Sequence, residues 1–141
     1  GELIVHREMP PMSPIVDPPE LAVPVDIIFV AAGSDARLLD ASRESARGVV
    51  VAAMGRGNVP PALVPAIERW IADDKPVVLT SRTQGGRVGH TYGYAGGGRR
   101  LEELGVIFGG SRRAQQARID LMLALGAGMS MSEVRALFSD E

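Results

Sequence analysis

The sequence contains no cysteine and only two histidines, His6 and His90. The absence of thiols excludes a disulfide framework, a zinc site built on thiolates and a cysteine nucleophile. The shortage of histidine also excludes a histidine-rich metal site. Lysine is equally scarce, because Lys75 is the single lysine among 15 basic residues. Chemistry that depends on a buried lysine therefore has one candidate.

The chain also lacks a large charge of either sign and a long hydrophobic run. Its 15 basic and 17 acidic residues give a formal net charge of −2, which provides no positive field to attract a nucleic acid. No apolar run approaches the 18 residues of a membrane-spanning helix, and no signal peptide is recognisable at the N-terminus. We therefore expect no nucleic-acid binding, no membrane binding and a cytoplasmic location.

Prolines set the beginning of the chain apart from the rest. The 141 residues provide room for one ordinary domain, and six of the ten prolines lie within the first 24 residues. Because proline fixes φ and interrupts helices, we expect residues 7–22 to form an extended connector, preceded by a short strand at residues 2–6. The predicted division is residues 1–22, a strand remnant of a missing N-terminal domain with its linker, and residues 23–141, an α/β domain.

Four short and nearly continuous apolar runs occupy residues 25–30, 48–53, 76–80 and 106–108. Such runs, rich in β-branched residues, are typical of strands buried on both faces in a parallel sheet. Helical patterns separate them at residues 38–46, 63–71 and 101–104. The alternation predicts an α/β fold: a parallel four-stranded sheet with helices on both faces, in a Rossmann- or flavodoxin-like three-layer domain.

Two further helices are expected after the last strand. We predict that Ser111 caps the first and that Gly126 and Gly128 end it. Residues 130–133 (SMSE) form a capping-box sequence for the second. The residues predicted to face inward are Ala114, Ile119, Met122 and Leu125 in the first helix, and Val134, Leu137 and Phe138 in the second.

Ligands of open parallel sheets bind beyond the carboxyl ends of the strands, which lead here into residues 31–35, 54–58 and 80–86. In the second of these loops, Gly55 and Gly57 permit backbone turns that other residues avoid. Asn58 follows, directly before a predicted helix. Two roles are open for Asn58: a helix N-cap, or a contact with a ligand. No dinucleotide or phosphate-loop motif occurs.

Ser81 and Arg82 directly follow the third predicted strand. Arg82 either binds a carboxylate of a ligand or ties neighbouring loops to their carbonyls. The next stretch, residues 85–98, contains seven glycines together with Tyr92 and Tyr94. We expect a long exposed loop that closes over a ligand or packs on another subunit.

The chain contains no recognisable active site of its own. His6 precedes the connector, and His90 lies in the glycine-rich stretch with no carboxylate nearby in the sequence. No segment has the nucleophile-elbow pattern. We therefore expect no catalytic residue and no metal ligand in this chain.

Five segments follow one another in a distinctive order: 48–51 (GVVV), 55–60 (GRGNVP), 76–82 (PVVLTSR), 92–98 (YGYAGGG) and 117–125 (ARIDLMLAL). Together they resemble the C-terminal domain of the bacterial-type L-asparaginase/glutaminase family over residues 23–138. The resemblance implies a two-domain amidohydrolase with a threonine nucleophile and no cofactor, assembled as a homodimer or a dimer of dimers. It also implies that Asn58 contacts the amino-acid substrate in a neighbouring subunit's active site. The position of the loops beyond the strand ends places Gly55, Gly57, Ser81 and Arg82 at the rim.

The chain departs from that family in the catalytic motifs. Thr80, Thr83 and Thr91 lie outside any T-G-G-T-type segment, and residues 116–118 (QAR) stand where the family has Lys-Ala-Arg. We therefore expect the C-terminal part of an L-asparaginase-like amidohydrolase, inactive without its N-terminal domain. Two alternatives remain: a non-catalytic amino-acid-binding or oligomerisation module, and the matching domain of a tRNA-dependent amidotransferase subunit.

Overall fold

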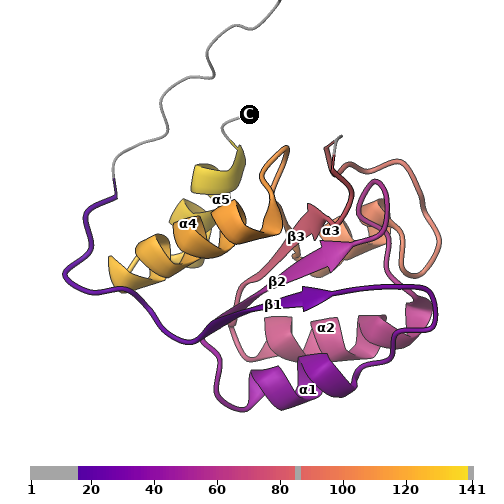
Figure 1. Cartoon of the computed structure of the whole chain (residues 1–141), viewed down its shortest axis with the longest axis horizontal. Coiled ribbons are helices and arrows are strands. Elements are labelled where there is room, and N and C mark those ends of the chain that lie inside the picture. The colour runs from indigo at the N-terminus through magenta and orange to yellow at the C-terminus, as the bar shows by residue number, and fades with distance from the viewer. Residues whose placement is uncertain (1–15, 85–86, 140–141) are drawn as a thin grey trace, which may run out of the picture.

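A parallel sheet lies at the centre of the computed structural model, which describes residues 16–84 and 87–139. Its strands β1, β2, β3 and β4 are neighbours in the order of the sequence (Figure 1). They comprise Val25–Phe29, Gly48–Ala53, Val77–Ser81 and Ile107–Phe108. The predicted α/β fold with a four-stranded parallel sheet is confirmed. The strand predicted at residues 2–6 and most of the predicted connector lie outside the described residues.

Helices cover both faces of this sheet. The connecting helices are α1 (Arg37–Arg43), α2 (Val64–Ala72), preceded by the 3₁₀ turn η1 (Pro61–Leu63), and α3 (Gly98–Leu104). Right-handed crossovers between strands that are sequential neighbours place every connecting helix on one face. The other face is covered by α4 (Ala114–Gly126) and α5 (Met131–Ser139), on the opposite side of the sheet from α1 and α2 in Figure 1.

The two faces of β2 divide the core into two layers. All six residues of β2 are buried. Val49 and Val51 pack in the cluster that contains Trp70 of α2, whereas Val50 packs in the cluster that contains Leu121 of α4. The Trp70 indole N–H donates to the Leu39 carbonyl of α1 at 2.9 Å, so its buried polar atom is satisfied. A nearly continuous apolar run is therefore required at β2.

The start of α4 differs from the prediction. The helix begins at Ala114, and its first turn is closed by the Gln116 side chain, whose Oε1 accepts the Arg113 N–H at 2.9 Å. Ser111 therefore lies before the helix and is not its cap. Ile119 is 46% exposed instead of facing inward, because Ala117 and Leu121 define the buried stripe.

The helix α4 ends at the two predicted glycines. Gly126 belongs to the helix, and Gly128, with φ of +70°, follows it. A Cβ on Gly126 would lie 2.0 Å from the Glu20 carbonyl oxygen. The segment before β1 crosses α4 at this point, where the N–H of Ala22 donates to the Met122 carbonyl at 3.1 Å. Gly126 therefore serves close packing.

The predicted capping box of α5 is confirmed. The Ser130 hydroxyl donates to Glu133 Oε2 at 2.6 Å and the Ser130 N–H donates to the same oxygen at 2.8 Å. These two hydrogen bonds lower the pKa of Glu133, because they stabilise its ionised form. The predicted inward residues Val134, Leu137 and Phe138 are buried. Among the described residues, no helix has the length and apolar character needed to cross a membrane.

We predict that Ser130→Ala lowers the free energy of unfolding by about 1 kcal/mol at neutral pH, as other N-cap truncations do. A carboxylate with a lowered pKa stabilises the fold above its unfolded pKa, and this contribution disappears as the pH falls through its folded pKa. The deficit of Ser130→Ala should therefore shrink in acid. Urea denaturation at neutral and at acidic pH measures the loss of unfolding free energy. Ser45→Ala, at an exposed position, is the control. An equal loss in both variants would contradict the capping role.

Candidate functional site

Three loops meet at one edge of the sheet, because β1, β2 and β3 run in the same direction (Figure 1). The register pairs Ala53 with Ser81 at the ends of β2 and β3, and the Arg82 N–H continues this ladder by donating to the Ala53 carbonyl at 2.9 Å. The loops that begin at Met54 and Arg82 are therefore side by side. This edge is the predicted site rim.

The loop after β2 is a tight backbone turn. Met54 and Asn58 exchange two N–H···O hydrogen bonds of 2.9 Å each. Between them, Gly55 has φ of +51° and Gly57 has φ of +101°, a region that L-residues avoid. A Cβ on Gly57 would also lie 2.9 Å from Leu79 Cδ2. Both glycines are required by the geometry that presents Asn58.

Asn58 does not cap a helix. The 3₁₀ turn η1 has Pro60 at its N-cap, and no side chain caps it or α2. The physical reason is that Pro60 and Pro61 have no N–H, which removes donors that a cap would serve. The Oδ1 atom of Asn58 is instead buried and has no hydrogen-bond partner among the described residues. A buried acceptor without a partner costs about 1–3 kcal/mol.

Ser81 connects the two loops. Its hydroxyl donates to the Gly55 carbonyl at 2.6 Å, and its oxygen lies 2.7 Å from Thr83 Oγ1. Since a hydroxyl has one proton, the Thr83 hydroxyl is the donor to Ser81. The Thr83 N–H donates to the same oxygen at 3.2 Å. Ser81 therefore holds the glycine turn against the end of β3.

Arg82 ties the loops together through its backbone alone. Its side chain is exposed and makes no hydrogen bond or ion pair to another described residue. It lines a shallow hollow of about 160 Å³ with Phe29 and Arg113. The binding of a carboxylate by Arg82 stays a prediction.

The glycine-rich segment packs on its own domain. The Gly96 carbonyl accepts the Val59 N–H at 2.9 Å, and the Gly89 N–H donates to the Arg56 carbonyl at 3.0 Å. A Cβ on Gly96 would lie 2.0 Å from the Val59 carbonyl oxygen, and one on Gly98 would lie 2.4 Å from that of Gly89. These glycines thus allow the segment to close over the loop that carries Asn58.

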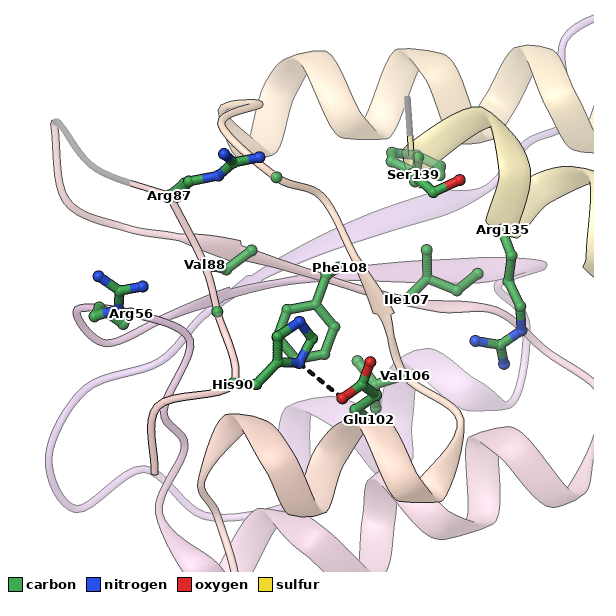
Figure 2. Close-up of a pocket in the computed structure, with 13 residues that line it drawn as sticks. Arg56, Arg87, Val88, His90, Glu102, Val106, Ile107, Phe108, Arg135 and Ser139 are labelled. Carbon is green, nitrogen blue, oxygen red and sulfur yellow. Dashed lines mark ion pairs between the residues drawn. The ribbon is translucent and has the colours of Figure 1, made fainter. Parts of the chain in front are cut away.

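His90 has a carboxylate partner that its sequence neighbours do not reveal. Its Nδ1 lies 2.8 Å from Glu102 Oε2 of α3, and its ring lies 4.7 Å from that of Phe108 between centroids. Figure 2 shows the three side chains together in a pocket beside β4. The sequence does not reveal the pairing, because eleven residues of loop and helix separate His90 from Glu102.

Among the described residues, no hydrogen bond joins the hydroxyl of Thr80 or Thr91 to a histidine, lysine or carboxylate side chain. Lys75 precedes β3 and donates to the Arg43 carbonyl at 2.6 Å, whereas Thr80 and Thr83 lie at the opposite end of that strand. Thr91 is exposed in the glycine-rich segment. Within residues 16–84 and 87–139, no three histidine, aspartate or glutamate side chains are gathered as a metal site.

Residues 116–118 have structural contacts. Gln116 closes the first turn of α4, Ala117 is buried, and Arg118 Nε donates to the Val25 carbonyl at 2.5 Å. Arg118 thereby attaches α4 to β1.

Comparison with known proteins identifies relatives over nearly the whole chain. Residues 24–138 match the family model of the glutaminase/asparaginase C-terminal domain. A probable L-asparaginase of Deinococcus radiodurans is 40% identical over 139 residues, which cover 99% of this chain and 42% of that protein. A component of the glutamyl-tRNA(Gln) amidotransferase of Pyrococcus abyssi is 33% identical over 92 residues, which cover 64% of this chain and 20% of that protein.

A solved structure has the same architecture. The thermostable L-asparaginase from Thermococcus kodakarensis superimposes with a TM-score of 0.74 at 31% identity, covering 85% of this chain and 37% of that one. The chain thus spans less than half the length of each of these relatives.

The geometry of the glycine turn predicts unequal effects at its two glycines. We expect Gly55→Ala to lower the free energy of unfolding by about 1–2 kcal/mol, the cost of a left-handed conformation for an L-residue. Gly57→Ala should lose more, because its Cβ also meets Leu79. A Gly57→Ala, Leu79→Ala double variant should lose less than the sum of the two single variants. Thermal denaturation tests this, and equal losses at Gly55 and Gly57 would contradict it.

Proposed function

The chain belongs to the glutaminase/asparaginase family as its C-terminal domain, and on this basis we propose that it is part of an L-asparaginase. The reaction converts L-asparagine and water into L-aspartate and ammonia. In this proposal the threonine nucleophile lies in an N-terminal domain that pairs with residues 23–141, and residues 1–22 connect the two. The 40% identity to the Deinococcus protein supports the assignment.

Asn58 is the residue through which this domain contacts the substrate. The observation that carries this role is its buried Oδ1, which has no partner among the described residues. An amide offers one acceptor and two donors, which match the α-ammonium and α-carboxylate of an amino acid. Buried polar atoms are rarely left unpaired, so an ammonium donor from the substrate accounts for this one. The site is completed by a neighbouring subunit.

The other rim residues hold Asn58 in place. Gly55 and Gly57 form the turn, and Ser81 fastens it to β3 through the Gly55 carbonyl. A turn fastened in this way limits the rearrangement that Asn58 undergoes when the substrate binds, which preserves affinity. Arg82 lies at the same edge, where its charge favours an anionic substrate group.

We predict that Asn58→Ala in the full-length enzyme lowers kcat/KM for asparagine about tenfold or more, equivalent to ~1.4 kcal/mol of transition-state stabilisation. Its melting temperature should stay near that of the parent, because Oδ1 has no hydrogen bond to lose among the described residues. Steady-state ammonia release and thermal denaturation measure the two quantities.

The matched control is Gln116→Ala, which removes another amide side chain. Its Oε1 accepts a backbone N–H, so this variant should lose stability and keep its kcat/KM. If Asn58→Ala instead behaved like Gln116→Ala, a structural role would replace the proposed substrate contact.

We further predict that residues 1–141 alone release no ammonia from asparagine. Covalent catalysis requires a nucleophile and a base within hydrogen-bond reach, and neither Thr80 nor Thr91 makes a hydrogen bond to a basic side chain among the described residues. The assay uses the purified chain with its fold checked by circular dichroism. Turnover above the blank that persists through repurification would contradict this prediction.

Self-association is the remaining element of the proposal. Phe29 on β1 and Leu38 on α1 are 58% and 65% exposed, and exposed apolar side chains in one region favour contact with another protein surface. A homodimer or a dimer of dimers brings Asn58 to a neighbour's active site.

The alternative, a domain of a tRNA-dependent amidotransferase, is supported by the 33% identity to the Pyrococcus protein. Ammonia transfer to a charged tRNA, with no free release, would favour that alternative.

A further inference from the structure

A second pocket lies beside the edge strand β4, away from Ser81 and Arg82. It encloses about 520 Å³, a volume within the range of small-molecule sites. Phe108 of β4, Val88 and Phe138 of α5 contribute its apolar lining. His90 stands over Phe108 and is paired with Glu102.

The pocket gathers positive charge in a chain whose net charge is −2. Arg56, Arg87 and Arg135 line it, and Glu102 is the one acidic residue among the described lining residues. Figure 2 shows Arg56 and Arg87 on one side and Arg135 on the other, with His90, Phe108 and Glu102 between them. Arginine is suited to planar acid groups, which it binds through two parallel N–H donors.

The arginines at the two ends of the pocket are positioned by different contacts. Arg135 Nη2 donates to the Gly105 carbonyl at 2.5 Å, which fixes the guanidinium and leaves its other donors for a ligand. Arg56 is held at its backbone by the Gly89 N–H, and its guanidinium has no hydrogen bond or ion pair to another described residue. The nearby backbone N–H of Val88 is occupied by the Gly110 carbonyl. Recognition here therefore depends on side-chain charge.

We propose that this pocket binds a small organic molecule with an acid group at each end and an apolar or planar body between them. The acid groups pair with Arg56 and Arg135, and the body lies against Phe108. The inference does not rest on asparaginase activity. Because Arg56 stands between Gly55 and Gly57, such a ligand also contacts the turn that presents Asn58.

The test is calorimetric titration of the full-length protein with terephthalate, a rigid ring with an acid group at each end, at constant ionic strength. Benzoate, the same ring with one acid group, is the comparison. We expect terephthalate to bind about tenfold or more tightly than benzoate, because it engages both arginines. Equal affinities, or no binding of terephthalate, would overturn the proposal.

Some variants are expected to weaken binding of terephthalate and another to strengthen it. Because a folding defect can only weaken binding, the comparison separates the two causes. Arg56→Gln and Arg135→Gln should each weaken terephthalate binding about tenfold. Glu102→Gln should strengthen it about fivefold, because it removes a negative charge that faces the ligand's acid groups. Arg37→Gln, on the far edge of the sheet with a side chain 88% exposed, is the matched charge control. A loss of binding in Arg37→Gln equal to that in Arg135→Gln, or weaker binding in Glu102→Gln, would also overturn the proposal.

Discussion

The burial of β2 on both faces is the constraint on which the rest of the domain depends. Its neighbours in the sheet are its neighbours in the sequence, and right-handed crossovers leave α1, α2 and α3 on one face. The opposite face would expose Val50 and Ala52 to water without α4 and α5. The glycine at position 126 and the bond between Arg118 and Val25 follow from this requirement, because both bring α4 close to the chain around β1.

Close backbone approach organises the carboxyl edge of the sheet. Gly57 lies against Leu79, Gly96 against the Val59 carbonyl and Gly98 against that of Gly89. These contacts stack the glycine-rich segment on the turn after β2, with Ser81 bridging from β3. The turn is thus held from both sides. A site built this way needs little rearrangement on binding, although it depends on backbone geometry as much as on the residues that touch the ligand.

One short turn connects the two proposed sites. Asn58 at its end carries an amide oxygen that has no partner among the described residues, and Arg56 at its centre lines the pocket beside β4. Both sites lie at this turn because it follows β2, which is buried between β1 and β3. The turn therefore adjoins the loops that follow the neighbouring strands. Family membership through residues 24–138 agrees with the five sequence segments that suggested it, three of which line this edge.

Local patterns in the sequence are enough to predict the fold class, the four strands, the apolar stripe of α2 and the capping box of α5. These features depend on local spacing, since apolar periodicity and Ser130 three residues before Glu133 are visible without coordinates. Contacts between distant polar groups, by contrast, are visible in the folded domain alone. In the folded domain His90 pairs with Glu102, and Ile119 is exposed. Neither Asn58 nor Ser111 caps a helix. Such outcomes depend on how loops far apart in the chain pack together, and no local pattern records that packing.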